Sequence, residues 1–102
     1  MKMLKIDKRV ELVEIAEHGG EPSVDVLRAE VRGEVSYIDI GDDAVVLVNA
    51  SAEASGMQQN PIASLIARRQ LYGPALIAGA DGTNRTLADT PEDFVVLLGL
   101  ES

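Results

Sequence analysis

The residues best suited to binding chemistry gather in one segment of this chain, residues 49–73. Side-chain amides offer paired hydrogen-bond donors and acceptors, and guanidinium groups bind anions such as phosphate. A helix beginning at Pro61 would add main-chain N–H groups that also favour anions. A purely structural role, such as capping a helix, is the alternative at each position. We predict a site for a small nucleotide-like ligand formed by Asn49, Gln58, Asn60, Arg68, Arg69 and Tyr72.

The sequence offers little that resembles a catalytic or metal-binding cluster. The single histidine, His18, lies in a glycine-rich segment without a partner at the spacing of a metal site or a catalytic triad. Asp42 and Asp43 would suit an acid pair, but adjacent acids are also common turn residues. The absence of cysteine excludes thiolate chemistry. We therefore predict a protein that is not an enzyme and uses no cofactor; a small enzyme using these three residues is the alternative.

The balance of charge limits the partners of this protein. The formal net charge is -8 at pH 7, which repels nucleic-acid phosphates, so we expect no direct nucleic-acid binding. The same charge makes an acidic inhibitor of a basic host protein an alternative function. No apolar run approaches the roughly 18 residues of a membrane span, and the N-terminus lacks a secretory signal. We expect a cytoplasmic protein without a membrane segment.

Length and composition predict a single folded domain over residues 1–102. Apolar residues make up 46% and charged residues 25% of the chain, which is typical of globular proteins and not of disordered ones. Several short runs rich in apolar and β-branched residues, bounded by turn residues, are typical of strands. We expect these strands at residues 3–6, 10–15, 36–40, 44–48 and 75–78.

Three short helices are predicted from capping residues followed by apolar residues at helical spacing. Ser23, Asn60 and Thr90 are the expected N-caps, and the apolar residues of the last helix are Phe94, Val95, Leu97 and Leu98. The order β-β-α-β-β-α-β-α then predicts an α+β fold, a small mixed or antiparallel sheet with helices covering one face. An open edge of such a sheet would also allow a homodimer.

A set of features between residues 35 and 79 has a counterpart in a known family. An aromatic-Ile-acid strand begins at Tyr37, and a second strand ends at Asn49. A glycine-containing loop then leads to Asn60 at the start of a helix, and a glycine-rich strand follows at residues 72–79. In these features the chain resembles the domain-of-unknown-function 3846 family, short proteins of bacteriophages and other mobile elements.

The resemblance implies a phage or mobile-element origin rather than a particular reaction, because the family as a whole has no assigned activity. Small acidic proteins of that origin often act as host-takeover or counter-defence factors. The chain departs from the family pattern at residues 50–54, where the family carries acidic residues and a lysine. We expect a non-enzymatic binding protein in the host cytoplasm that sequesters a host protein or a small nucleotide-like ligand.

Overall fold

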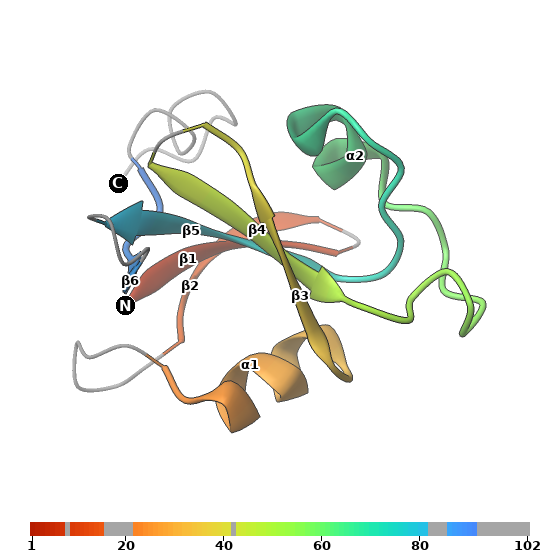
Figure 1. Ribbon diagram of the computed structural model, residues 1–102, viewed down its shortest axis with the longest axis horizontal. Coiled ribbons are helices and arrows are strands. Elements are labelled where there is room, and N and C mark those ends of the chain that lie inside the picture. Colours follow the sequence, from red (N-terminus) through yellow and green to blue (C-terminus); the bar gives the residue numbers. More distant parts are fainter. Residues whose placement is uncertain (8, 16–21, 42, 82–85, 92–102) are drawn as a thin grey trace.

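The described part of the chain forms an antiparallel sheet with a helix on either side (Figure 1). The computed structural model describes residues 1–7, 9–15, 22–41, 43–81 and 86–91. The elements are β1 (Lys2–Ile6), β2 (Val10–Glu14), α1 (Val24–Val31), β3 (Val35–Asp39), β4 (Ala44–Asn49), α2 (Pro61–Ala67), β5 (Ala75–Asp81) and β6 (Thr86–Ala88). The strand order is β2-β1-β5-β4-β3, and β6 pairs with β5.

The predicted α+β class and antiparallel sheet are confirmed, but the predicted element order is not matched. Within the described residues the structure has six strands and two helices, not five strands and three helices. The additional strand, β6, has three residues and is defined by its pairing with Gly79–Asp81 of β5. A run this short carries no periodic signal in the sequence. The helix predicted at Phe94 to Leu98 lies outside the described residues.

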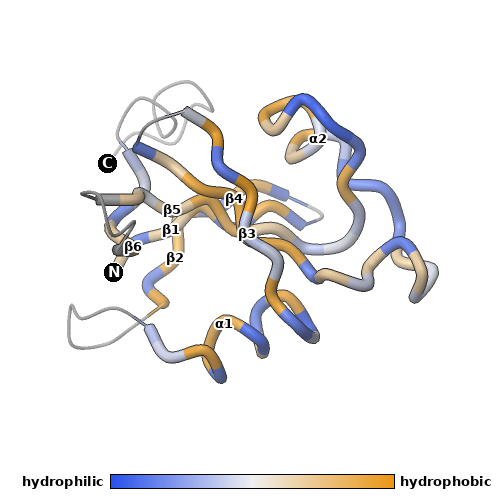
Figure 2. Tube along the Cα trace, viewed as in Figure 1, coloured by the Kyte–Doolittle hydropathy of each residue, from blue (hydrophilic) through white to orange (hydrophobic). Residues whose placement is uncertain are grey.

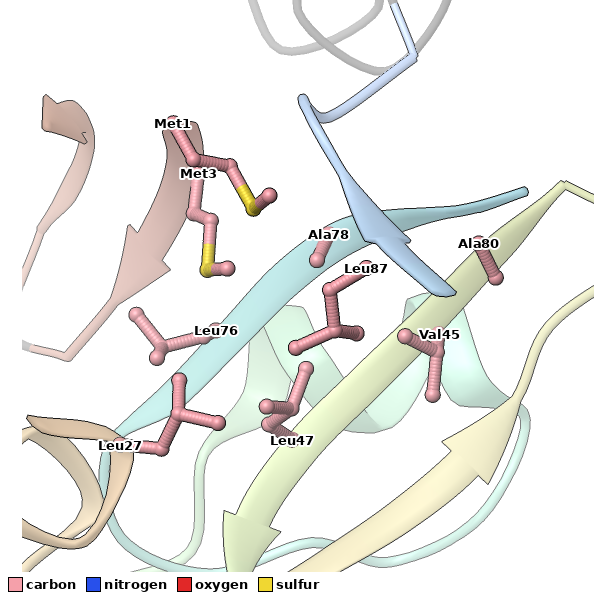
Figure 3. Close-up of a cluster of buried hydrophobic side chains, with 9 residues drawn as sticks. All are labelled: Met1, Met3, Leu27, Val45, Leu47, Leu76, Ala78, Ala80 and Leu87. Carbon is pink, nitrogen blue, oxygen red and sulfur yellow. The ribbon is translucent and has the colours of Figure 1, made fainter. Parts of the chain in front are cut away.

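The helices lie on opposite faces of the sheet, so the expectation that they cover one face is wrong. Successive residues of a strand point to opposite faces. On one face Leu47 and Leu76 pack with Leu27 of α1 in one buried cluster (Figure 3). On the other face Val46 packs with Ala63 of α2 in a second cluster. Strand β4 is buried at every position and apolar until its last residue (Figure 2), as two covered faces require.

Both described helices begin at the predicted capping residues. The Ser23 hydroxyl accepts a hydrogen bond from the Val26 N–H at 3.4 Å, and the Asn60 side chain accepts one from the Ala63 N–H. Pro61 follows Asn60 at the start of α2, where its missing N–H costs nothing. Local side-chain chemistry therefore sets where each helix starts.

Thr90 joins the segment after β6 to the centre of the sheet. Its main-chain N–H donates to the Lys2 carbonyl at 2.9 Å. Its buried hydroxyl accepts from the Leu4 N–H at 3.0 Å and donates to the Ile77 carbonyl. We predicted Thr90 as the N-cap of a third helix, whose residues lie outside the described ones; in the described residues the Thr90 hydroxyl bridges β1 and β5.

Candidate functional site

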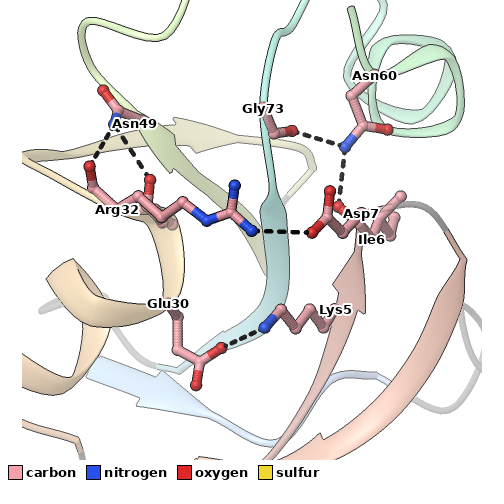
Figure 4. Close-up of polar contacts among 9 residues, drawn as sticks. Lys5, Ile6, Asp7, Glu30, Arg32, Asn49, Asn60 and Gly73 are labelled. Atoms are coloured by element: carbon pink, nitrogen blue, oxygen red, sulfur yellow. Dashed lines mark hydrogen bonds and ion pairs between the residues drawn. The ribbon is translucent and has the colours of Figure 1, made fainter. Parts of the chain in front are cut away.

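Asn49, at the end of β4, is bonded to the C-terminal end of α1 (Figure 4). Its Nδ2 donates to the carbonyls of Val31 at 3.1 Å and Arg32 at 2.9 Å. Its Oδ1 accepts from the Ser51 N–H at 2.7 Å. The last carbonyls of a helix lack hydrogen-bond donors within the helix, and the Asn49 amide provides these donors. A ligand could reach its amide N–H groups only by displacing these carbonyls.

Asn60 makes a similar set of contacts at the start of α2. Its Nδ2 donates to the carbonyls of Ile6 at 2.8 Å and Gly73 at 2.9 Å (Figure 4), and its Oδ1 accepts from the Ala63 N–H at 3.2 Å. The side chain is buried, with 5% of the residue exposed. Asn60 therefore ties α2 to β1 and to the loop before β5, and its amide groups are already bonded within the chain.

A groove of about 440 Å³ lies beside Asn60, between the end of β1, the end of α1 and the start of α2. Among the described residues that line it, Arg32 Nη2 and Asp7 Oδ2 form an ion pair at 3.7 Å, and the Arg32 side chain is 66% exposed. Gln58 and Gln59 are exposed on its wall. The described residues that line it are Asp7, Arg32, Met57, Gln58, Gln59, Asn60, Pro61, Gly73 and Pro74.

Arg32 adopts a left-handed backbone conformation at the C-terminal end of α1, with φ 64°. Glycine is the usual residue here because a side chain makes this conformation less favourable. The next residue, Gly33, leaves room for Asn49, since a Cβ on Gly33 would come within 2.8 Å of Asn49 Nδ2. Arg68 has the same role at the end of α2, with φ 58°. The two arginines therefore share a backbone conformation, but only Arg32 borders the groove.

A smaller hollow of about 140 Å³ is lined in part by Ala50, Ala52 and Glu53 of the loop that follows β4. It brings Asn49, Arg69 and Tyr72 together, whereas Gln58 and Asn60 line the larger groove. Arg68 is exposed at the end of α2. The six predicted ligand residues therefore do not share one site: they divide between two hollows and one helix end.

Arg32 and Asp7 border the groove but were not among the predicted site residues. Gly33 is a typical helix-ending residue, and the arginine before it carries no motif of a binding site. The position of Arg32 directly before a helix-ending glycine was the only feature of the sequence that could have drawn attention to it. Its proximity to Asp7 depends on the pairing of distant strands, which no local pattern reveals.

The described residues contain no group of three His, Cys, Asp or Glu side chains that could hold a metal ion. Of the proposed acid–base residues, Asp43 is exposed, and His18 and Asp42 lie outside the described residues. No helix in the described part is both long and apolar enough to cross a membrane. The catalytic alternative gains no supporting geometry from these observations.

Comparisons with known proteins assign no family to this chain. No protein-family model matches it, and neither a curated protein nor a solved structure matches it. The resemblance to the domain-of-unknown-function 3846 family therefore stays a prediction from the sequence.

Proposed function

We propose that this is a non-enzymatic binding protein whose groove beside Arg32 takes a small nucleotide-like ligand. The observation that carries the proposal is the groove itself, about 440 Å³ in volume, which lies within the roughly 300–1,000 Å³ typical of small-molecule sites. Its wall combines the exposed Arg32 guanidinium, which lies beside the Asp7 carboxylate, with side-chain amides. A guanidinium can bind a phosphate through two parallel hydrogen bonds, and amides can bind a base edge.

The contacts of Arg32 support this role. Its separation from Asp7 is 3.7 Å, longer than a direct hydrogen bond, so the guanidinium can turn toward an anion without losing a tight partner. The Arg32 carbonyl is held by Asn49 at 2.9 Å, which fixes the backbone below the side chain.

The biological setting in this proposal follows the family resemblance. A small acidic protein of phage or mobile-element origin would act in the cytoplasm of the host bacterium, where binding alone removes a signalling nucleotide from its receptor. Such a counter-defence factor needs no catalytic group, only an affinity that competes with the receptor. The second candidate, an acidic inhibitor of a basic host protein, is favoured by the net charge of -8.

Titration calorimetry tests the ligand class, using inorganic phosphate and a panel of linear and cyclic nucleotides. Arg32→Asn removes the guanidinium and keeps a residue that tolerates the left-handed conformation. Arg68→Asn is the matched control, because it removes the same charge from the same backbone conformation at an end of α2 outside the groove.

We expect Arg32→Asn to weaken nucleotide binding by roughly ten- to a hundredfold, the effect of losing a charge-assisted hydrogen-bond pair. Arg68→Asn should stay within about threefold of the unmodified protein, since only long-range charge is lost. No heat with any nucleotide, or equal losses in the two variants, would overturn the proposal.

A further inference from the structure

Strand β3 is an edge of the sheet, and part of its main chain has no hydrogen-bond partner among the described residues. The Ala50 N–H donates to the Glu34 carbonyl at 2.8 Å, so the even-numbered residues of this stretch bond to β4. Main-chain groups alternate in direction along a strand, which turns those of Val35 and Tyr37 away from β4. Within the described part of the chain, neither residue makes a hydrogen bond on that side.

An apolar hollow lies beside this edge on the face that carries α1. Its volume is about 330 Å³. Tyr37, which is 52% exposed, and Asp39 are its β3 residues, and Leu27 of α1 is its wall on the helix side. The remaining described residues that line it are Pro22, Val24, Val45, Ala80 and Leu87.

The smaller hollow lies on the opposite face of the same edge. Its β3 residues are Ser36 and Ile38, which alternate with Tyr37 and Asp39 along the strand. A further strand beside β3 would alternate in the same way, so its side chains would enter the apolar hollow and the smaller hollow in turn. Open main-chain groups with a hollow on each face are the features that strand addition requires.

The charge around the edge indicates the chemistry of the added strand. Glu34 is largely exposed, and Asp39, Asp43 and Glu53 are exposed as well; they outnumber the exposed Arg69 of the smaller hollow. Arg28, the cation beside Glu34 at 3.1 Å, already shares its charge with a second carboxylate. A second copy of this chain would bring the same acidic edge against itself, whereas a basic segment would be attracted.

We propose that the β3 edge binds an extended, basic segment of a partner protein as an additional strand. Alternate apolar side chains of that segment occupy the 330 Å³ hollow, and its Lys or Arg residues lie beside the acidic groups of the edge. The main-chain groups of Val35 and Tyr37 provide the hydrogen bonds. None of the described residues of either hollow lines the groove at Arg32, so this site is separate from the proposed nucleotide site.

Amide hydrogen exchange measured by NMR tests the docking mode. The probe is a short synthetic peptide that alternates valine and lysine, and the control alternates valine and glutamate. At saturating valine–lysine peptide, exchange at Val35 and Tyr37 should slow by roughly tenfold or more, because their N–H groups become bonded. Ser36 and Ile38, already bonded to β4, should change little. The glutamate peptide should leave all four amides unchanged.

Two sets of variants separate strand addition from a general attraction. Tyr37→Pro removes an outward N–H without breaking the bonds to β4, and Tyr37→Ala removes the same ring but keeps that N–H. We expect the proline variant to lose at least about fivefold more peptide affinity than the alanine variant. N-methylation of the peptide tests the same point without a change in the protein. Methylating the alternate residues whose N–H groups face β3 should abolish binding, whereas methylating the other alternate residues should not.

Equal effects of the two N-methylated sets would overturn the proposal. So would protection at Val10 and Leu12 of β2, the other edge of the sheet, in place of Val35 and Tyr37. Protection that rises with protein concentration in the absence of peptide, together with a dimer mass, would assign the edge to a second copy. Arg32→Asn should leave peptide binding intact, which keeps this result distinct from the nucleotide test.

Discussion

Replacing Asn60 tests whether this buried amide is a structural link between α2, β1 and the loop before β5. Its Nδ2 donates to the Ile6 and Gly73 carbonyls at 2.8 and 2.9 Å, and its Oδ1 caps α2 through the Ala63 N–H at 3.2 Å. Asn60→Ala removes all three bonds and leaves their partners in a site with little access to water. Asn60→Asp keeps the capping oxygen but replaces both amide donors with an acceptor.

The expected loss follows from these contacts. Losing an N-cap costs about 1 kcal/mol. Leaving a buried carbonyl without its donor costs about 1–3 kcal/mol, and two carbonyls are affected. Partial access to water at Gly73, which is half-buried, favours the lower end for that carbonyl. We therefore expect Asn60→Ala to lower the free energy of unfolding by about 3–5 kcal/mol, a large share of the 5–15 kcal/mol of a typical domain.

Urea unfolding followed by circular dichroism measures this loss. Gln59→Ala is the matched control, because Gln59 is the adjacent amide and is exposed, and it should change stability by less than about 0.5 kcal/mol. Asn60→Asp should destabilise about as much as Asn60→Ala, since the donors are lost in both. If Asn60→Asp unfolds like the unmodified protein, the cap alone matters and the link to the Ile6 and Gly73 carbonyls has been overvalued.

Two further changes test how the end of the described chain joins the sheet. Thr90→Val should lower the free energy of unfolding by about 1–3 kcal/mol in urea, because the Ile77 carbonyl loses its hydroxyl donor, whereas Thr90→Ser should keep most of the stability. Gly79→Ala places a methyl group against the Asp89 carbonyl oxygen, so it should speed amide exchange in β6. Unchanged exchange in β6 would show that β5 and β6 accommodate the methyl group without separating.

The local elements of the fold were predictable because their signals are local. The caps at Ser23 and Asn60 and the apolar run of β4 each lie within a few consecutive residues. Strand β6 and the position of the helices were not predictable in this way. A three-residue strand exists only through its partner β5, and the face that a helix covers depends on how the connecting segment turns.

The candidate site shows the same limit for side chains. Asn49 and Asn60 were predicted as ligand residues, but the sequence did not show that their amides are bonded within the chain. Asn60 reaches a carbonyl 54 residues away, and Asn49 reaches one 18 residues away. A buried amide and a ligand-binding amide have the same residue type, so only the three-dimensional contacts separate them.

Substituting a buried polar residue should change the stability of the protein, whereas substituting an exposed one should change its affinity for a partner. Asn49 and Asn60 are buried with their amides bonded within the chain, so their variants should change the free energy of unfolding. Arg32 and Tyr37 expose a charge and an edge of main chain, so their variants should change affinity at nearly constant stability. The groups of the two proposed sites would then be held on a fixed scaffold. Loss of nucleotide binding in a well-folded Arg32→Asn variant would therefore locate the ligand, whereas a loss in an Asn60 variant would report only on folding.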